Sequence, residues 1–133
     1  MDKYIIFHVE GGIGKNLMAT AVATAIKKAH PDRKLIVTAP WGAVWFNHPT
    51  IDRFYILGQT PYFFEDYIKN KDTWIFKSEP YHHHDFLNGK RYLADIWCEQ
   101  LGVPYNGELP VLILSKNEKD NIARKLKGFG KPI

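Results

Sequence analysis

The chain has 133 residues, of which 45% are hydrophobic and 24% are charged, and its net charge is +4. Length and composition are typical of one soluble globular domain, and the lack of an apolar run near ~20 residues excludes a membrane-spanning helix. Cys98 is the only cysteine, which excludes an internal disulfide and, without a signal-peptide pattern, favours a cytoplasmic protein, at most peripheral at the inner membrane face.

Strand and helix patterns alternate through the first part of the chain. Residues 4–9 (YIIFHV) and 34–39 (KLIVTA) are near-continuous apolar runs, which predict strands buried on both faces. Between them, residues 14–29 carry apolar side chains at helical spacing, and Pro31 marks the end of this predicted helix. Residues 41–47 (WGAVWFN) predict a short helix.

The alternation continues through the middle of the chain. Residues 52–57 (DRFYIL) and 72–77 (DTWIFK) predict the third and fourth strands, and a short helix at 61–68 separates them. After a histidine-containing loop, residues 90–101 predict a helix with one apolar face, and Gly102 is its expected C-cap.

A fifth strand and a last helix are expected near the end of the chain. Residues 110–114 (PVLIL) predict the strand. Ser115 and Glu118 have the spacing of a capping box, so a helix should follow, ended by Gly128.

This alternation predicts an α/β fold in which residues 1–133 form a single Rossmann-like domain. We expect three layers, with a mainly parallel five-stranded sheet and helices on both faces. The expected order is third, second, first, fourth and fifth strand. Ligands of such sheets bind beyond the carboxyl ends of the strands, where the strand order reverses.

The loop after the first strand reads EGGIGKN and invites comparison with two nucleotide-binding motifs. A phosphate-binding loop of the KGGxGK[ST] type would have lysine in place of Glu10 and a hydroxyl for Mg²⁺ in place of Asn16. No predicted strand ends in the aspartate that would hold the metal. The dinucleotide fingerprint also fails, because Leu17 stands at its third glycine.

Glycines in this loop have a simpler physical meaning. Gly11, Gly12 and Gly14 allow a tight turn and a close approach of the backbone to a ligand. The N–H groups at the following helix start favour an anion, and Lys15 can bind phosphate or remain a solvated lysine. The alternative is a tight strand-to-helix turn in which glycine serves packing alone.

Four phrases of the chain, in order, resemble one enzyme family. They are MATAVATAIKKAHPDRKLIVTA, NHPTIDRFYIL, RYLADIWCEQLGVPY and LPVLILSKNEKDNIARKL. Together they resemble the N-terminal half of the heptosyltransferase-like enzymes, which are glycosyltransferases of family nine with the two-domain GT-B fold. The resemblance covers nearly all of the chain, although no single motif is strict.

The resemblance implies the acceptor-side domain of a glycosyltransferase. Such an enzyme transfers a sugar from a nucleotide-sugar donor to a glycan or lipopolysaccharide-type acceptor, without a further cofactor or nucleic acid. A donor-binding domain, in the same or another chain, is implied as well, and the 133 residues alone should be inactive. Lys15 stands where the heptosyltransferases have an aspartate thought to act as base, so that role cannot be carried over.

Glu10 is the candidate base, because it ends the first strand at the edge where ligands bind. The alternative for Glu10 is a loop carboxylate paired with Lys15 or a backbone N–H. Trp41 can stack on a sugar or simply pack.

The loop EPYHHHDF supplies the remaining candidates, with Glu79, His82 and His83 as acceptor contacts. A metal site is not expected, because three consecutive histidines do not share one side of a strand or helix. Two other functions remain open: a non-catalytic α/β binding module, and a nucleotide-binding protein of the phosphate-loop type.

Overall fold

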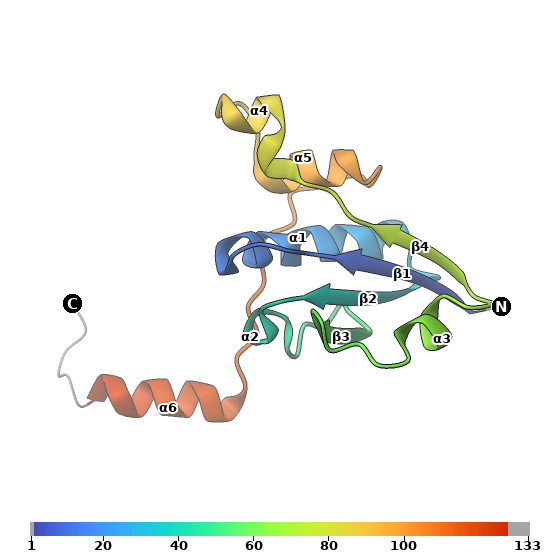
Figure 1. Ribbon diagram of the computed structural model, residues 1–133. Coiled ribbons are helices and arrows are strands. Elements are labelled where there is room, and N and C mark those ends of the chain that lie inside the picture. The colour runs from blue at the N-terminus through green and yellow to red at the C-terminus, as the bar shows by residue number, and fades with distance from the viewer. Residues whose placement is uncertain (1, 128–133) are drawn as a thin grey trace.

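Four of the five expected strands form a parallel sheet in the computed structural model, which describes residues 2–127 (Figure 1). The strands lie in the order β3-β2-β1-β4, so that the order reverses between β1 and β4. The register places Ile6 of β1 beside Ile36 of β2 and Ile75 of β4. The strands are β1 (Lys3–His8), β2 (Lys34–Ala39), β3 (Arg53–Ile56) and β4 (Asp72–Phe76).

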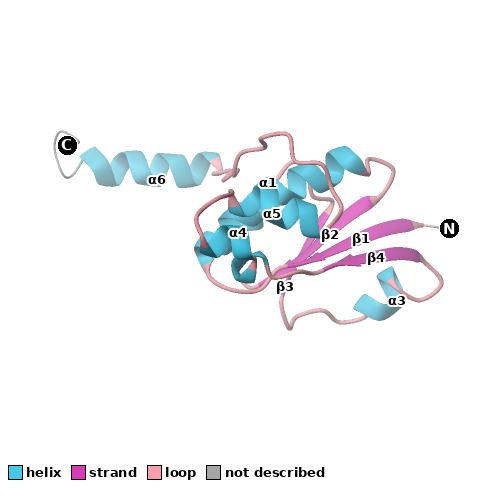
Figure 2. Ribbon diagram, turned by 90° about the horizontal axis from the view of Figure 1, so that it is seen from above, coloured by secondary structure: helices cyan, strands magenta, loops and turns pink. Residues whose placement is uncertain are grey.

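One face of the sheet carries the main core. The helices α1 (Ile13–Ala29), α2 (Gly42–Trp45) and α5 (Leu93–Gln100) contribute to it, with the long α1 running along the sheet (Figure 2). Phe7 of β1 meets Trp45 and Trp97 edge to face, and all three side chains are fully buried. Burial of large apolar side chains stabilises a fold by roughly 1.5–3 kcal/mol each, and these contacts hold α2 and α5 against β1.

The other face is covered only in part. The short helix α3 (Phe63–Tyr67) packs near the amino ends of the strands, where Tyr67 contacts Tyr4 edge to face (Figure 1). A small cluster of Ile6, Ile36 and Tyr67 is buried beneath it. Toward the carboxyl ends this face is bare, and Ile75 of β4 remains 62% exposed.

The prediction of a fifth strand is wrong, and the fold is a broadly Rossmann-like α/β arrangement with four strands. Residues 110–114 have no strand structure. They cross α1, where the Val111 N–H donates to the Thr20 hydroxyl at 2.8 Å. Just before them, the buried Glu108 side chain lies 3.5 Å from Lys28 at the end of α1. These contacts attach the segment to α1, so β4 forms the edge of the sheet within residues 2–127.

The helix α6 (Lys116–Lys127) follows this segment and extends away from the sheet (Figure 1). Its predicted capping box is confirmed. The Glu118 N–H donates to the Ser115 hydroxyl at 3.1 Å, and the Ser115 N–H donates to the Glu118 carboxylate at 3.2 Å. The expected helix end at Gly128 lies outside the described residues.

The remaining elements lie between β4 and α5. They are a 3₁₀ turn, η1 (Pro80–His82), and the one-turn helix α4 (His84–Leu87). Gly102 ends α5 as expected, since it has a left-handed φ of 69° and directly follows the C-cap residue Leu101. No helix within residues 2–127 is long and apolar enough to cross a membrane.

Candidate functional site

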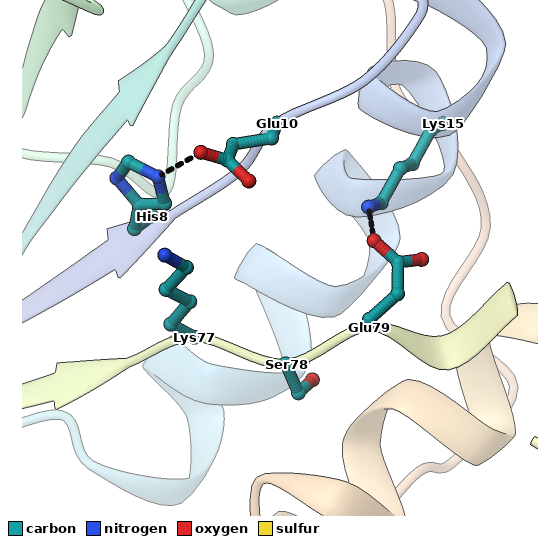
Figure 3. Close-up of a pocket in the computed structure, with 6 residues that line it drawn as sticks. All are labelled: His8, Glu10, Lys15, Lys77, Ser78 and Glu79. Atoms are coloured by element: carbon teal, nitrogen blue, oxygen red, sulfur yellow. Dashed lines mark hydrogen bonds and ion pairs between the residues drawn. The ribbon is translucent and has the colours of Figure 1, made fainter. Parts of the chain in front are cut away.

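A polar cavity of about 260 Å³ opens between the carboxyl ends of β1 and β4. This is the point where the strand order reverses, the usual place for a ligand in a parallel sheet. The loop after β1, the start of α1 and the segment after β4 meet there (Figure 3). Its lining consists of His8, Glu10, Lys15, Lys77, Ser78 and Glu79.

Glu10 lies at the mouth of this cavity, with 56% of its side chain exposed. One carboxylate oxygen is 3.2 Å from Nε2 of His8, and the other ring nitrogen of His8 is 3.1 Å from the Thr38 hydroxyl. The contact with His8, followed by the positive charge of Lys77, lowers the pKa of Glu10 below its usual value. Glu10 is therefore ionised at neutral pH, as a proton acceptor must be.

Lys15 is directed to a different carboxylate. Its side chain is only 7% exposed, and Nζ donates to Glu79 at 2.5 Å (Figure 3). The same ammonium lies 5.6 Å from the ring centroids of Tyr81 and Trp97. The alternative in which Glu10 pairs with Lys15 does not form, because His8 is the partner of Glu10.

Glu79 has a lowered pKa despite partial burial. Burial acts to raise the pKa, but the hydrogen bond from Lys15 and the N–H of Tyr81 outweigh it. Because the carboxylate is held in its charged form, the pair joins the segment after β4 to the start of α1.

The lowered pKa of Glu79 predicts how stability depends on pH. A carboxylate whose folded pKa lies below its unfolded value contributes stability above the unfolded pKa, and that stability is lost as pH falls through the folded value. The free energy of unfolding should therefore fall more steeply for the native chain than for Glu79→Gln as pH drops below about 4.5. Urea unfolding across the acid range measures both slopes.

Glu65→Gln on α3 is the matched control, because Glu65 is exposed and makes no ion pair within residues 2–127. Its slope should equal that of the native chain. Equal slopes for the native chain and Glu79→Gln would contradict the assigned role of the Lys15–Glu79 pair.

The glycine loop needs glycine at one position. Gly11 has a φ of 90°, and a Cβ there would lie 2.8 Å from Cδ of Lys15. Gly12 is the N-cap of α1 in an extended conformation, and Gly14 lies in the first turn with open space around it. A residue outside the loop also holds the turn, because the Trp41 indole donates to the Gly11 carbonyl at 2.9 Å.

Of the predicted loop contacts, only Glu79 lines the cavity. His83 is the N-cap of α4, where its Nδ1 accepts from the Asp85 N–H at 3.0 Å. His82 is exposed at the end of η1. Among the described residues, no three His, Cys, Asp or Glu side chains lie close enough to hold a metal ion.

Three lining residues were not among the sequence-based candidates: His8, Lys77 and Ser78. His8 ends β1 and Lys77 directly follows β4, so both are polar residues placed at the carboxyl ends of apolar strands. That position was the available signal for each of them.

Comparisons with models of protein families, with curated proteins and with solved structures give no match for this chain. The resemblance to the heptosyltransferase-like enzymes therefore stays a prediction from the sequence.

Proposed function

We propose that this chain is the acceptor-side domain of a heptosyltransferase-like glycosyltransferase. It would act with a donor-binding domain, in the same or another chain, to move a sugar from a nucleotide-sugar donor to a glycan or lipopolysaccharide-type acceptor. The observation that carries the proposal is the carboxylate of Glu10, ionised and accessible at the strand end where the order reverses.

In this reaction Glu10 takes the proton of an acceptor hydroxyl while the hydroxyl oxygen attacks the anomeric carbon of the donor sugar. The new carbon–oxygen bond forms as the bond to the diphosphate breaks, and the diphosphate leaves with the electron pair. His8 fixes the carboxylate, because its other nitrogen is held by Thr38. Lys77 supplies positive charge beside the reacting groups.

Trp41 and Glu79 are the acceptor contacts that fit a sugar. The Trp41 ring is 41% exposed, and its indole N–H bonds to the loop that carries Glu10, so a flat apolar surface is held near the base. One oxygen of Glu79 binds Lys15, and the carboxylate remains 43% exposed for a sugar hydroxyl.

The nucleotide-binding alternative is opposed by the same contacts. Lys15, which would have to reach phosphate, is buried and paired with Glu79. Asn16, which would have to assist Mg²⁺, is fully buried within the fold. The non-catalytic binding module differs from the proposed enzyme in turnover alone, so it is separated by the Glu10 experiment in the Discussion.

Titration calorimetry with core oligosaccharides released from lipopolysaccharide tests the proposal. The native chain should bind at least one of them, and Trp41→Ala should weaken that binding by roughly tenfold through loss of ring stacking. Phe64→Ala, which removes an exposed ring on α3, is the control and should bind normally. Nucleotide sugar and Mg²⁺-ATP should give no micromolar binding, and such binding without any oligosaccharide binding would contradict the proposal.

A further inference from the structure

A second hollow lies on the face of the sheet that α3 leaves bare. It is a groove of about 270 Å³ whose apolar lining comes from β1, β4, α3 and the segments on either side of α3. Its apolar side chains are Ile6, Leu57, Phe63, Ile68 and Ile75.

The exposed part of this lining lies at the carboxyl end of the sheet. Ile75 is 62% exposed and Leu57 38%, whereas Ile6 forms the buried floor. Apolar side chains gathered in a hollow, rather than scattered singly, usually mark a place where a ligand is bound. The volume is at the low end for ligand pockets, which limits the occupant to a compact group.

Lys77 gives the groove a charged end. It lies two residues after Ile75, and in an extended chain such side chains point to the same side, so both line the groove. It makes no ion pair with any residue between 2 and 127. Lys77 and His8 line the groove and the polar cavity alike, whereas Glu10 lines only the cavity.

We propose that this groove binds a compact apolar group, of one or two rings, that carries an anionic group. The apolar part lies against Ile6, Phe63 and Ile75, and the anion lies at Lys77. An ammonium at the edge of an apolar hollow favours an anion over a neutral ligand of the same shape, because it attracts the opposite charge and can donate hydrogen bonds to it. The inference goes beyond the proposed sugar transfer, since it needs neither a sugar donor nor Glu10.

Calorimetric titration with 1-naphthyl phosphate, 1-naphthol and inorganic phosphate tests the groove. We expect the native chain to bind naphthyl phosphate roughly tenfold or more tightly than either naphthol or phosphate. Lys77→Ala should remove the preference over naphthol, and Ile75→Asp should abolish naphthyl phosphate binding. Both residues are exposed, so melting curves should show folded variants.

Lys90→Ala is the matched control for charge, because Lys90 is exposed in the loop before α5. It should leave all three affinities unchanged. Equal binding of naphthol and naphthyl phosphate, or equal loss in Lys90→Ala and Lys77→Ala, would overturn the proposal. So would sedimentation showing a dimer that Ile75→Asp dissociates, because a second copy of the chain would then fill the groove. None of these outcomes depends on whether oligosaccharides bind near Glu10.

Discussion

Glu10→Gln should lower the rate of sugar transfer by about 10²–10⁴-fold, measured in a form of the enzyme that includes the donor-binding domain. Glutamine keeps the size of the side chain and its contact with His8, but it cannot accept the proton of the acceptor hydroxyl. The side chain is 56% exposed and packs into no core, so the melting temperature should hardly change.

The pH dependence of kcat/KM gives a second readout of the same role. A base must be ionised, and contact with His8 and the charge of Lys77 lower the pKa of Glu10. The rate of the native enzyme should therefore fall only below about pH 4.5, where Glu10 becomes protonated, and the variant should lack this acid limb.

Glu65→Gln serves as the control carboxylate, because it is exposed on α3 far from the cavity lining. It should keep full activity. Turnover of Glu10→Gln within a few-fold of the native rate would place the base elsewhere, and Glu79 would then be the first alternative because it lines the same cavity. No turnover in any form of the native enzyme would favour the non-catalytic binding module instead.

The parts of the fold that could be predicted are those set by local pattern. Residues 34–39 form a strand as expected, and α1 ends at Ala29 before Pro31. The fifth strand failed because an apolar run of five residues does not reveal its partner. Residues 110–114 are held by Thr20 on α1 rather than by the free edge of β4.

Side-chain pairing in the site could not be predicted for a similar reason. In the sequence, Lys15 is five residues from Glu10, and a pair between them was one of the alternatives for Glu10. In the fold, α1 carries Lys15 over the end of β4, where Glu79 meets it, and strand geometry places His8 beside Glu10. The positions of the strand ends predicted that Glu10 and Glu79 lie at the same edge of the sheet, but not which atoms bond there.

Asn16→Ala should cost roughly 2–4 kcal/mol of the free energy of unfolding, measured by urea denaturation. Asn16 is fully buried, and its amide links two elements. Its oxygen accepts from the Trp45 indole at 3.0 Å, and its nitrogen donates to the Gly12 carbonyl at 2.9 Å. Alanine would leave the buried Trp45 N–H without a hydrogen bond, and the Gly12 carbonyl would keep only its bond from the backbone N–H of residue 16. Asn117→Ala, at an exposed position of α6, should cost little.

Asn16, which lacks the hydroxyl that a Mg²⁺ site would need, thus has a structural role. The variant Asn16→Asp tests whether that role depends on its hydrogen bonds or only on the packing of its side chain. Aspartate can still accept from Trp45, but when ionised it cannot donate to Gly12 and it buries a charge. Its folded pKa should therefore lie above the unfolded value near ~3.9, so the folded state binds more protons. The variant should gain stability relative to the native chain as pH falls toward that value.

A double-mutant cycle with Trp45→Phe isolates the bond between the two side chains. Phenylalanine removes the indole N–H, so Asn16→Ala should cost less in that background than in the native chain. A difference of about 1 kcal/mol or more would confirm that Asn16 couples α1 to α2 through this hydrogen bond. Additive costs would mean that the loss in Asn16→Ala comes from the cavity and from the Gly12 carbonyl alone. In that case α2, and with it Trp41, would be held beside the glycine loop by the Trp41–Gly11 bond rather than by Asn16.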